Sequence, residues 1–190
     1  KNSLILRDLD ILKEMAKLNI ISANISITSL SEDTRRLLEP RTASIKQRLK
    51  TVETLSENGI PVRVMMAPII PSLNSHEILP LVKKVAELGA HDVGYTIVRL
   101  NGQIAEIFKD WAHKTIPDKA ERILNQIAEC HGGNLNDSNW GRRMKGDGTI
   151  SEQVKNTMAL AKKRYLNERI VEPLDVSHFL QLKNPQMRLF

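Results

Sequence analysis

The sequence predicts an α/β fold with a parallel sheet, followed by a helical extension. Between residue 3 and about residue 98, segments with apolar residues at helical spacing alternate with short apolar, β-branched runs, which is the pattern of βαβ units. Beyond residue 98 only helical spacing recurs. A content of 41% hydrophobic and 26% charged residues is typical of a globular protein with an apolar core.

The predicted elements have recognisable boundaries. Gly59 and Gly89 follow two helical segments and end them, because glycine readily adopts the left-handed conformation that closes a helix, and Ser75 is the expected N-cap of another. The elements are a helix over 4–16, a strand over 20–28, a helix over 44–57, a strand over 60–67, a helix over 75–88, a strand over 93–98, helices over 103–113, 118–131 and 151–165, a polar loop over 132–148, and an extended tail over 172–190.

The strand count predicts part of a longer protein. A parallel sheet is normally covered on both faces, and a closed barrel of alternating strands and helices has about eight strands, whereas only three are predicted here. The sequence also begins at Lys1 rather than at a methionine. We therefore expect this chain to be a fragment.

Cysteine content and hydropathy exclude several classes of protein. The single cysteine, Cys130, rules out a disulfide framework, a four-thiolate zinc site and an iron–sulfur cluster held by three cysteines of this chain, and we expect it to be a core residue. No apolar run approaches the roughly 20 residues of a membrane helix, and no signal peptide opens the chain. We expect a cytoplasmic protein with no membrane partner.

Positive charge is concentrated in the last quarter of the chain. Residues 1–141 carry 18 basic and 17 acidic side chains, and residues 142–190 carry 10 and 5, so +5 of the net +6 lies in the second segment. Such a basic end favours a polyanion such as DNA or RNA. A solvated surface that only aids solubility is an equally good interpretation.

Two strand ends carry residues suited to a ligand. In the first predicted strand, apolar residues alternate with Asn24, Ser26 and Thr28, so small polar groups line one face near the carboxyl end, where α/β folds bind ligands. After the second strand, Pro68 and Pro71 flank two isoleucines and stiffen an extended loop that suits a flat apolar ligand. A plain proline-bounded turn explains the loop equally well.

Together these segments resemble the second half of radical S-adenosylmethionine (SAM) enzymes of the spore photoproduct lyase type, and in particular a bacterial branch of uncharacterised proteins related to that lyase. The motifs are short, but their order and spacing run along nearly the whole chain. The segments that carry the resemblance are residues 1–3, 25–28, 38–42, 67–71, 95–100, 132–133 and 140–148.

The resemblance implies a partial (β/α)6 barrel in which a [4Fe–4S] cluster cleaves SAM reductively, giving a 5′-deoxyadenosyl radical that abstracts hydrogen from the substrate. On this basis residues 1–100 are the C-terminal half of the barrel, residues 101–171 are a helical extension with a basic loop, and residues 172–190 are the tail. The family's CxxxCxxC loop is missing from this sequence. We therefore expect this chain alone neither to bind a cluster nor to cleave SAM, and we assign it no catalytic or metal-ligating residue.

The resemblance also implies a set of SAM-binding residues. Lys1 resembles the lysine that reaches the methionine carboxylate, Ser26 resembles the serine at the methionyl end, and Thr28 occupies the ribose-side position. Glu39 and Arg41 match a segment that packs near the pocket, although a mutual or helix-terminal salt bridge explains them equally well. Backbone and apolar contacts to adenine are implied for Ala67, Pro68 and Ile69.

Two further segments are candidate interfaces. The glycine-punctuated loop holds Arg142, Arg143 and Lys145 for phosphate contacts and Trp140 for stacking on a base, although a polar turn between helices is an alternative. At the C-terminus, Gln186, Leu189 and Phe190 resemble the pentapeptide by which bacterial replication and repair proteins bind the sliding clamp. An apolar terminus that packs on its own domain would show the same residues.

The resemblance predicts a radical SAM, lyase-like enzyme when full length, acting on nucleic acid as in DNA repair. One alternative is a barrel lyase or isomerase that binds a phosphate, which would require a glycine-rich loop after a late strand, and none follows Val98 directly. The other alternative is a non-catalytic adaptor for nucleic acid or the sliding clamp.

Overall fold

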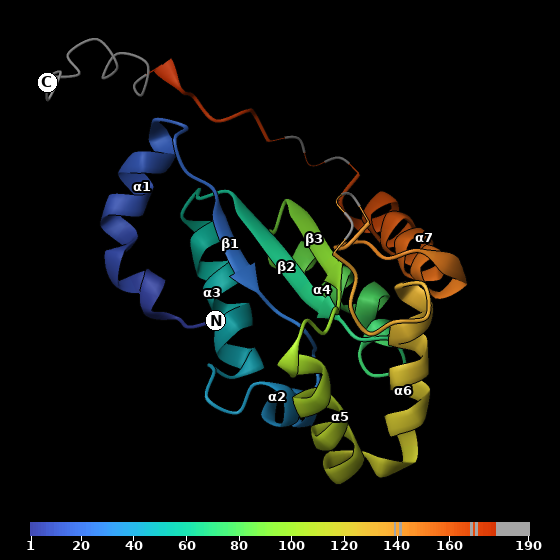
Figure 1. Cartoon of the computed structure of the whole chain (residues 1–190). Helices are drawn as coiled ribbons and strands as arrows, with labels where there is room; N and C mark the ends of the chain where they lie inside the picture. Colours follow the sequence, from blue (N-terminus) through green and yellow to red (C-terminus); the bar gives the residue numbers. More distant parts are fainter. Residues whose placement is uncertain (139, 141, 168, 170, 178–190) are drawn as a thin grey trace, which may run out of the picture.

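The computed structural model describes residues 1–138, 140, 142–167, 169 and 171–177. It contains a parallel sheet of β1 (Ala23–Ser26), β2 (Val62–Ile69) and β3 (Asp92–Ile97), with β2 in the centre (Figure 1). The α/β prediction is therefore confirmed. The (β/α)6 arrangement stays a prediction.

Strand pairing is regular except at the end of β2. Ala23 lies opposite Val62, and Val64 lies opposite Val93. The register between β2 and β3 shifts between Met66 and Ile69, where the Ala67–Pro68 peptide is cis. The irregular segment is the same proline-containing stretch that the sequence marks as a candidate ligand loop.

One face of the sheet is packed against helices. Helices α3 (Ile45–Glu57) and α4 (Ile78–Glu87) lie behind the strands in Figure 1. The predicted apolar alternation of the first strand is confirmed, because its apolar residues are buried in the main core. The core residues that β1 and its C-terminal extension contribute are Ala23, Ile25 and Ile27.

The opposite face of the sheet is more open and more polar. Asn24 and Arg63 are exposed, and Ser26 and Met65 are half-buried. A Cβ atom on Gly94 would come within 2.6 Å of the Met65 sulfur, so the glycine makes room for Met65 on this face. Parallel sheets usually have both faces covered, so the open face is available for a ligand or for further polypeptide.

Several details differ from the sequence-based prediction. The second strand covers Val62–Ile69 rather than residues 60–67, so Pro68 and Ile69 lie in the strand and not in a loop after it. The first strand covers Ala23–Ser26 rather than residues 20–28. The short helix α2 (Glu32–Leu38) was not predicted; Ser31 caps it by accepting a hydrogen bond from the Thr34 amide. The helix expected over 75–88 begins as a 3-10 turn, Ser75–Glu77, and Ser75 does not cap it. Residues 4–16 form a 3-10 turn, Leu4–Asp8, before helix α1 (Leu9–Lys17).

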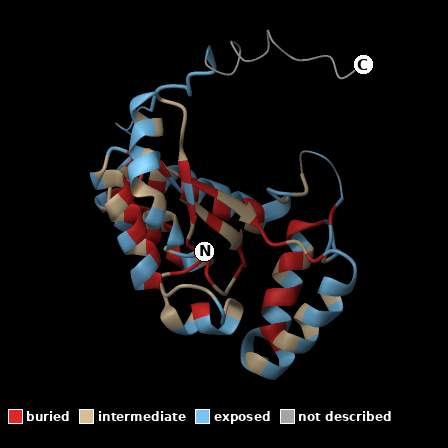
Figure 2. Ribbon diagram, turned by 90° about the vertical axis from the view of Figure 1, so that its left-hand side faces the viewer, coloured by how far each residue is buried: buried red, intermediate tan, exposed pale blue. Residues whose placement is uncertain are grey.

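The helical extension is joined to the sheet by two cores. Helices α5 (Gln103–Thr115) and α6 (Pro117–Cys130) form a hairpin, which packs on a small cluster that includes Val98 and Ile123. Helix α7 (Gly148–Tyr165) packs on α4 and contributes to the main core. Buried residues mark both cores in Figure 2. The residues that α7 adds to the main core are Val154, Met158 and Ala161.

The chain after α7 returns toward helix α1. Residues 171–176 have no regular secondary structure, and the side-chain amide nitrogen of Asn19 donates a hydrogen bond to the Pro173 carbonyl at 2.8 Å. This agrees with the extended conformation expected for the start of the tail. Among the described residues, no helix is both long enough and apolar enough to cross a membrane.

Candidate ligand site at the carboxyl edge of the sheet

Asn74 ties together the carboxyl ends of β1 and β2. Its side chain is fully buried. The amide group donates to the Thr28 carbonyl at 2.8 Å and to the Pro68 carbonyl at 3.1 Å, and its oxygen accepts from the Ile70 amide at 2.7 Å. One side chain therefore holds both strand ends at the same edge of the sheet, which is where α/β folds place their ligands.

Glu77 fixes the chain that leaves β1. Its buried carboxylate accepts hydrogen bonds from the Ser29 hydroxyl, at 2.7 Å, and from the Leu30 amide. Bonds between a carboxylate and fixed donors are stronger than those between neutral groups. The turn that follows β1 is consequently anchored to the segment that begins α4.

Arg48 connects helix α3 to the end of β1 and to the N-terminus. Its guanidinium is buried and donates to the Ser26 carbonyl at 3.1 Å and to the Glu39 carboxylate at 2.7 Å. Lys1 pairs with the other oxygen of the same carboxylate. Arg48 and Glu39 thus link Lys1 to the backbone carbonyl of Ser26. The resemblance places Lys1, Ser26 and Glu39 in or near the SAM pocket.

The Glu39 carboxylate is held in its charged form by these partners. Burial alone would raise the pKa of Glu39, but hydrogen bonds and charge from Lys1 and Arg48 outweigh burial and hold the pKa below its usual value. Glu39 forms salt bridges with Lys1 and Arg48, and the described residues show no mutual salt bridge between Glu39 and Arg41. Arg41 is exposed and forms no ion pair within the described part of the chain.

Thr28 carries an unsatisfied polar atom at this edge. The residue is 1% exposed, and its hydroxyl has no hydrogen-bond partner among the described residues. A buried hydroxyl without a partner costs about 1–3 kcal/mol. A polar ligand group that reached this hydroxyl would remove that cost, so the residue suits the ribose-side role that the resemblance implies.

Three residues of this site were not found by sequence reasoning. Arg48, Asn74 and Glu77 are polar residues that the sequence analysis did not single out, and their partners lie up to 48 positions away. The one local signal was Asn74, which follows the proline-rich loop by three residues. Ala67 and Pro68 are half-buried at the same edge and Ile69 is fully buried.

The basic loop lies beside the third strand. The Ile97 amide donates to the Met144 carbonyl at 3.0 Å, at the carboxyl end of β3. Arg142 donates to the buried Asp137 carboxylate at 2.6 Å, so this guanidinium has a structural partner. Lys145 is exposed.

Exposed Trp140 stacks with the half-buried Arg143. The guanidinium carbon lies 4.5 Å from the centre of the Trp140 ring, and Trp140 is 86% exposed. An exposed ring with a cation above it suits contacts to bases and phosphates. Gln186, Leu189 and Phe190 lie outside the described residues, so the sliding-clamp interpretation stays a prediction.

The residues present do not fit a [4Fe–4S] cluster. Cys130 is buried in the main core, and burial raises the pKa of its thiol to about 11. A cluster requires thiolates. In the described ranges, no three His, Cys, Asp or Glu side chains are grouped so that they could hold a metal ion.

Comparison with known proteins relates this edge of the sheet to one superfamily. Residues 2–85 match the Radical SAM superfamily. The radical SAM region contains β1, β2, Asn74 and Glu77, so it includes the whole framework that joins the two strand ends. The small parallel sheet is consistent with part of a radical SAM fold. Members of this superfamily in general use SAM and a [4Fe–4S] cluster for radical chemistry.

The curated relatives of this chain are longer than it is. The chain is 29% identical over 128 residues to an uncharacterized protein of Methanocaldococcus jannaschii, which covers 67% of this chain and 46% of the relative. It is 31% identical over 134 residues to an uncharacterized protein of Acidianus two-tailed virus, and the match covers 67% of this chain and 44% of the relative. An uncharacterized protein of Mycobacterium tuberculosis is 26% identical over 124 residues, and the match covers 64% of this chain and 36% of the relative.

The chain therefore spans less than half the length of these relatives. All three are described only as uncharacterized, so the closer resemblance to spore photoproduct lyase stays a prediction. That the full-length protein is an enzyme, with a lyase reaction and a role in DNA repair, stays a prediction.

Proposed function

We propose that this chain forms one side of the SAM site of a radical SAM enzyme. The observation that carries the proposal is the joining of the two strand ends by Asn74, which places Thr28 and the Ala67–Pro68 segment at one edge. That edge lies within the radical SAM region. SAM, when bound, supplies the methionyl, ribose and adenine groups that these residues would hold.

Each residue has a distinct part in this site. Ser26 provides a half-buried hydroxyl on the open face, and Thr28 provides a buried hydroxyl that lacks a partner among the described residues. Pro68 and its neighbours provide a rigid apolar surface for adenine. Lys1 is paired with Glu39, so it would bind the ligand carboxylate by sharing or exchanging its partner, and Glu39 acts as a positioning residue.

The cluster that completes the enzyme would be held by other residues. The described part of the chain has no thiolate set for it, and the curated relatives are more than twice as long as the matched segment. We propose that this chain by itself is inactive. Reconstitution with iron and sulfide under reducing conditions should leave it without a stoichiometric cluster, and one [4Fe–4S] cluster per chain would overturn this part of the proposal.

SAM binding is tested with a stable analogue. Titration calorimetry of the chain with S-adenosylhomocysteine should show weaker binding for Ser26→Ala, because the variant lacks the hydroxyl that faces the methionyl end. Asn24→Ala is the matched control, since Asn24 lies two residues nearer the amino end of the same strand. Equal affinities for the original chain and Ser26→Ala would contradict the assigned role.

For the substrate we propose nucleic acid, with a lyase or repair reaction as the finer expectation. The supporting observation is the position of the basic loop, whose backbone bonds to the end of β3 at the same edge as the SAM residues. There the exposed Trp140 ring stacks with the half-buried Arg143 guanidinium.

The nucleic-acid proposal is tested by salt dependence. The double variant Arg143→Ala, Lys145→Ala leaves the Arg142–Asp137 ion pair intact. For DNA binding by the original chain, log affinity should fall with log salt, and the double variant should reduce that slope by about 0.9 for each phosphate that it no longer neutralises. An unchanged slope would favour the interpretation of this loop as a polar turn between helices.

A further inference from the structure

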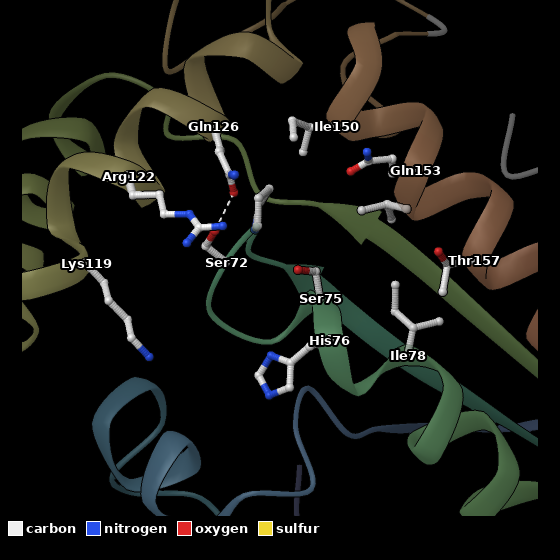
Figure 3. Close-up of a pocket in the computed structure, with 12 residues that line it drawn as sticks. Ser72, Ser75, His76, Ile78, Lys119, Arg122, Gln126, Ile150, Gln153 and Thr157 are labelled. Carbon is white, nitrogen blue, oxygen red and sulfur yellow. Dashed lines mark hydrogen bonds between the residues drawn. The ribbon is translucent and has the colours of Figure 1, made fainter.

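A pocket of about 510 Å³ lies outside the SAM residues, between the loop after β2 and helices α6 and α7 (Figure 3). The loop contributes Ser72 and Ser75, α6 contributes Lys119, Arg122 and Gln126, and α7 forms the opposite wall. Its size is within the usual range for small-molecule sites. None of the residues proposed for SAM lines it.

The polar side chains of this pocket can all donate hydrogen bonds, and two of them are cations. Lys119 and Arg122 lie one turn apart on α6, and neither has an ion-pair partner among the described residues. Ser72 donates to the Gln126 side-chain oxygen at 2.6 Å, which leaves the Gln126 amide nitrogen to donate to a ligand. His76 adds an imidazole to the lining (Figure 3).

Negative charge is missing from the described lining. None of the twelve residues drawn around the pocket is Asp or Glu. Glu77 is adjacent in sequence, but its carboxylate is buried against Ser29 and Leu30 and does not line the pocket. Lys119 and Arg122 have no ion-pair partner among the described residues, and hydroxyl, amide and imidazole groups line the same pocket. Such a lining favours an oxyanion.

Part of the lining of the same pocket is apolar. Pro71, Ile78, Ile150 and Val154 line it, so the cavity offers a surface for a compact uncharged body as well as cations for an anionic group. A bare anion would leave this surface unused. Sites of small ligands typically combine an apolar lining with a few placed polar groups.

We propose that this pocket binds a small phosphorylated molecule, with the phosphate at Lys119 and Arg122 and the flat or apolar body against Ile78 and Val154. Arginine suits this role because its planar guanidinium binds two phosphate oxygens at once. The site is separate from the proposed SAM site, and neither proposal depends on the other.

The test uses uridine monophosphate, uridine and inorganic phosphate as probes, because none of them carries adenine. In titration calorimetry of the chain, uridine monophosphate should bind at least about tenfold more tightly than uridine and than inorganic phosphate, since only it uses both parts of the pocket. Equal affinities for uridine monophosphate and uridine would overturn the phosphate assignment. If uridine monophosphate bound with the same affinity as inorganic phosphate, the placement of the apolar part of the ligand would be overturned.

The location is tested with two matched double variants. Lys119→Gln with Arg122→Gln should weaken the binding of uridine monophosphate by about tenfold or more. Lys46→Gln with Lys155→Gln removes the same charge from exposed positions outside the pocket and should change affinity less than twofold. Equal losses of affinity for uridine monophosphate in the two double variants would show a non-specific charge effect and overturn the assignment of the site. Binding of S-adenosylhomocysteine should be unchanged in both, which separates this test from that of the proposed function.

Discussion

At the scale of single residues, buried polar side chains organise the candidate site. Asn74, Arg48 and Glu77 each satisfy backbone or side-chain groups on a different segment of the chain. The sequence could predict Ser26 and Thr28, because they alternate with apolar residues along one strand. It could not predict Arg48 or Glu77, because burial of a charged residue depends on partners that lie far away in the sequence.

Thr28→Val tests whether the unpaired hydroxyl is a functional feature. Removal of a buried hydroxyl that has no partner among the described residues should raise the free energy of unfolding of the ligand-free chain by about 1 kcal/mol, measured by urea denaturation. The same variant should bind S-adenosylhomocysteine less tightly.

Thr51→Val is the control for this substitution. Thr51 is equally buried, but its hydroxyl donates to the Gln47 carbonyl at 2.8 Å, so the valine variant should gain no stability. A loss of stability in Thr28→Val would contradict the account, since it would show that the hydroxyl already has a stabilising partner.

The Glu39 ion pairs should make stability depend on pH. The folded state lowers the pKa of Glu39, so the stabilisation is present above the unfolded pKa of about 4.3 and is lost as pH falls through the lower, folded pKa. Glu39→Gln should therefore be less stable than the original chain near neutral pH, and the difference should shrink in acid.

The measurement is the free energy of unfolding across the range from about pH 3 to pH 7. Glu53→Gln is a control, because Glu53 pairs with Lys50 on the surface, and surface pairs contribute about 0–1 kcal/mol. A pH-independent difference between Glu39→Gln and the original chain would count against a charged, ion-paired Glu39.

At the scale of elements, the strand–helix alternation was predictable and the element ends were not. Ser44 caps α3 with a capping box and Gly59 follows that helix with positive φ, both of which are local signals. Helix α2 has only seven residues, too few for apolar spacing to show it. The start of α4 is set by Asn74 and Glu77, whose side chains bond to the segment after β1 rather than to the helix itself.

Asn74→Ala tests the joint between the ends of β1 and β2. The variant removes three buried hydrogen bonds and leaves their backbone partners unsatisfied, so the free energy of unfolding should fall by about 3 kcal/mol. Asn125→Ala, at an exposed position on α6, should change it by less than about 0.5 kcal/mol. Similar small effects in both variants would mean that the strand ends are held together by other interactions.

At the scale of the whole molecule, the sheet has one packed face and one open face. Composition and periodicity predicted the α/β class and the helical extension. Those patterns could not show that α7 packs on α4 in the same core as the strands, because such packing joins segments about 70 positions apart in the sequence. The open face and the match of residues 2–85 to the Radical SAM superfamily support our proposal of a SAM site at the carboxyl edge of the sheet.

Methyl NMR of the methionine side chains tests that central claim most directly. The sequence has six methionines; Met65 lies on the open face, whereas Met15 lies on α1 and Met158 is buried in α7. Titration of the methyl-labelled chain with S-adenosylhomocysteine should shift the Met65 signal and leave those of Met15 and Met158 unchanged. Saturating shifts of Met15 or Met158 with an unmoved Met65 signal, or no shift at millimolar ligand, would contradict a SAM site at the carboxyl edge of the sheet.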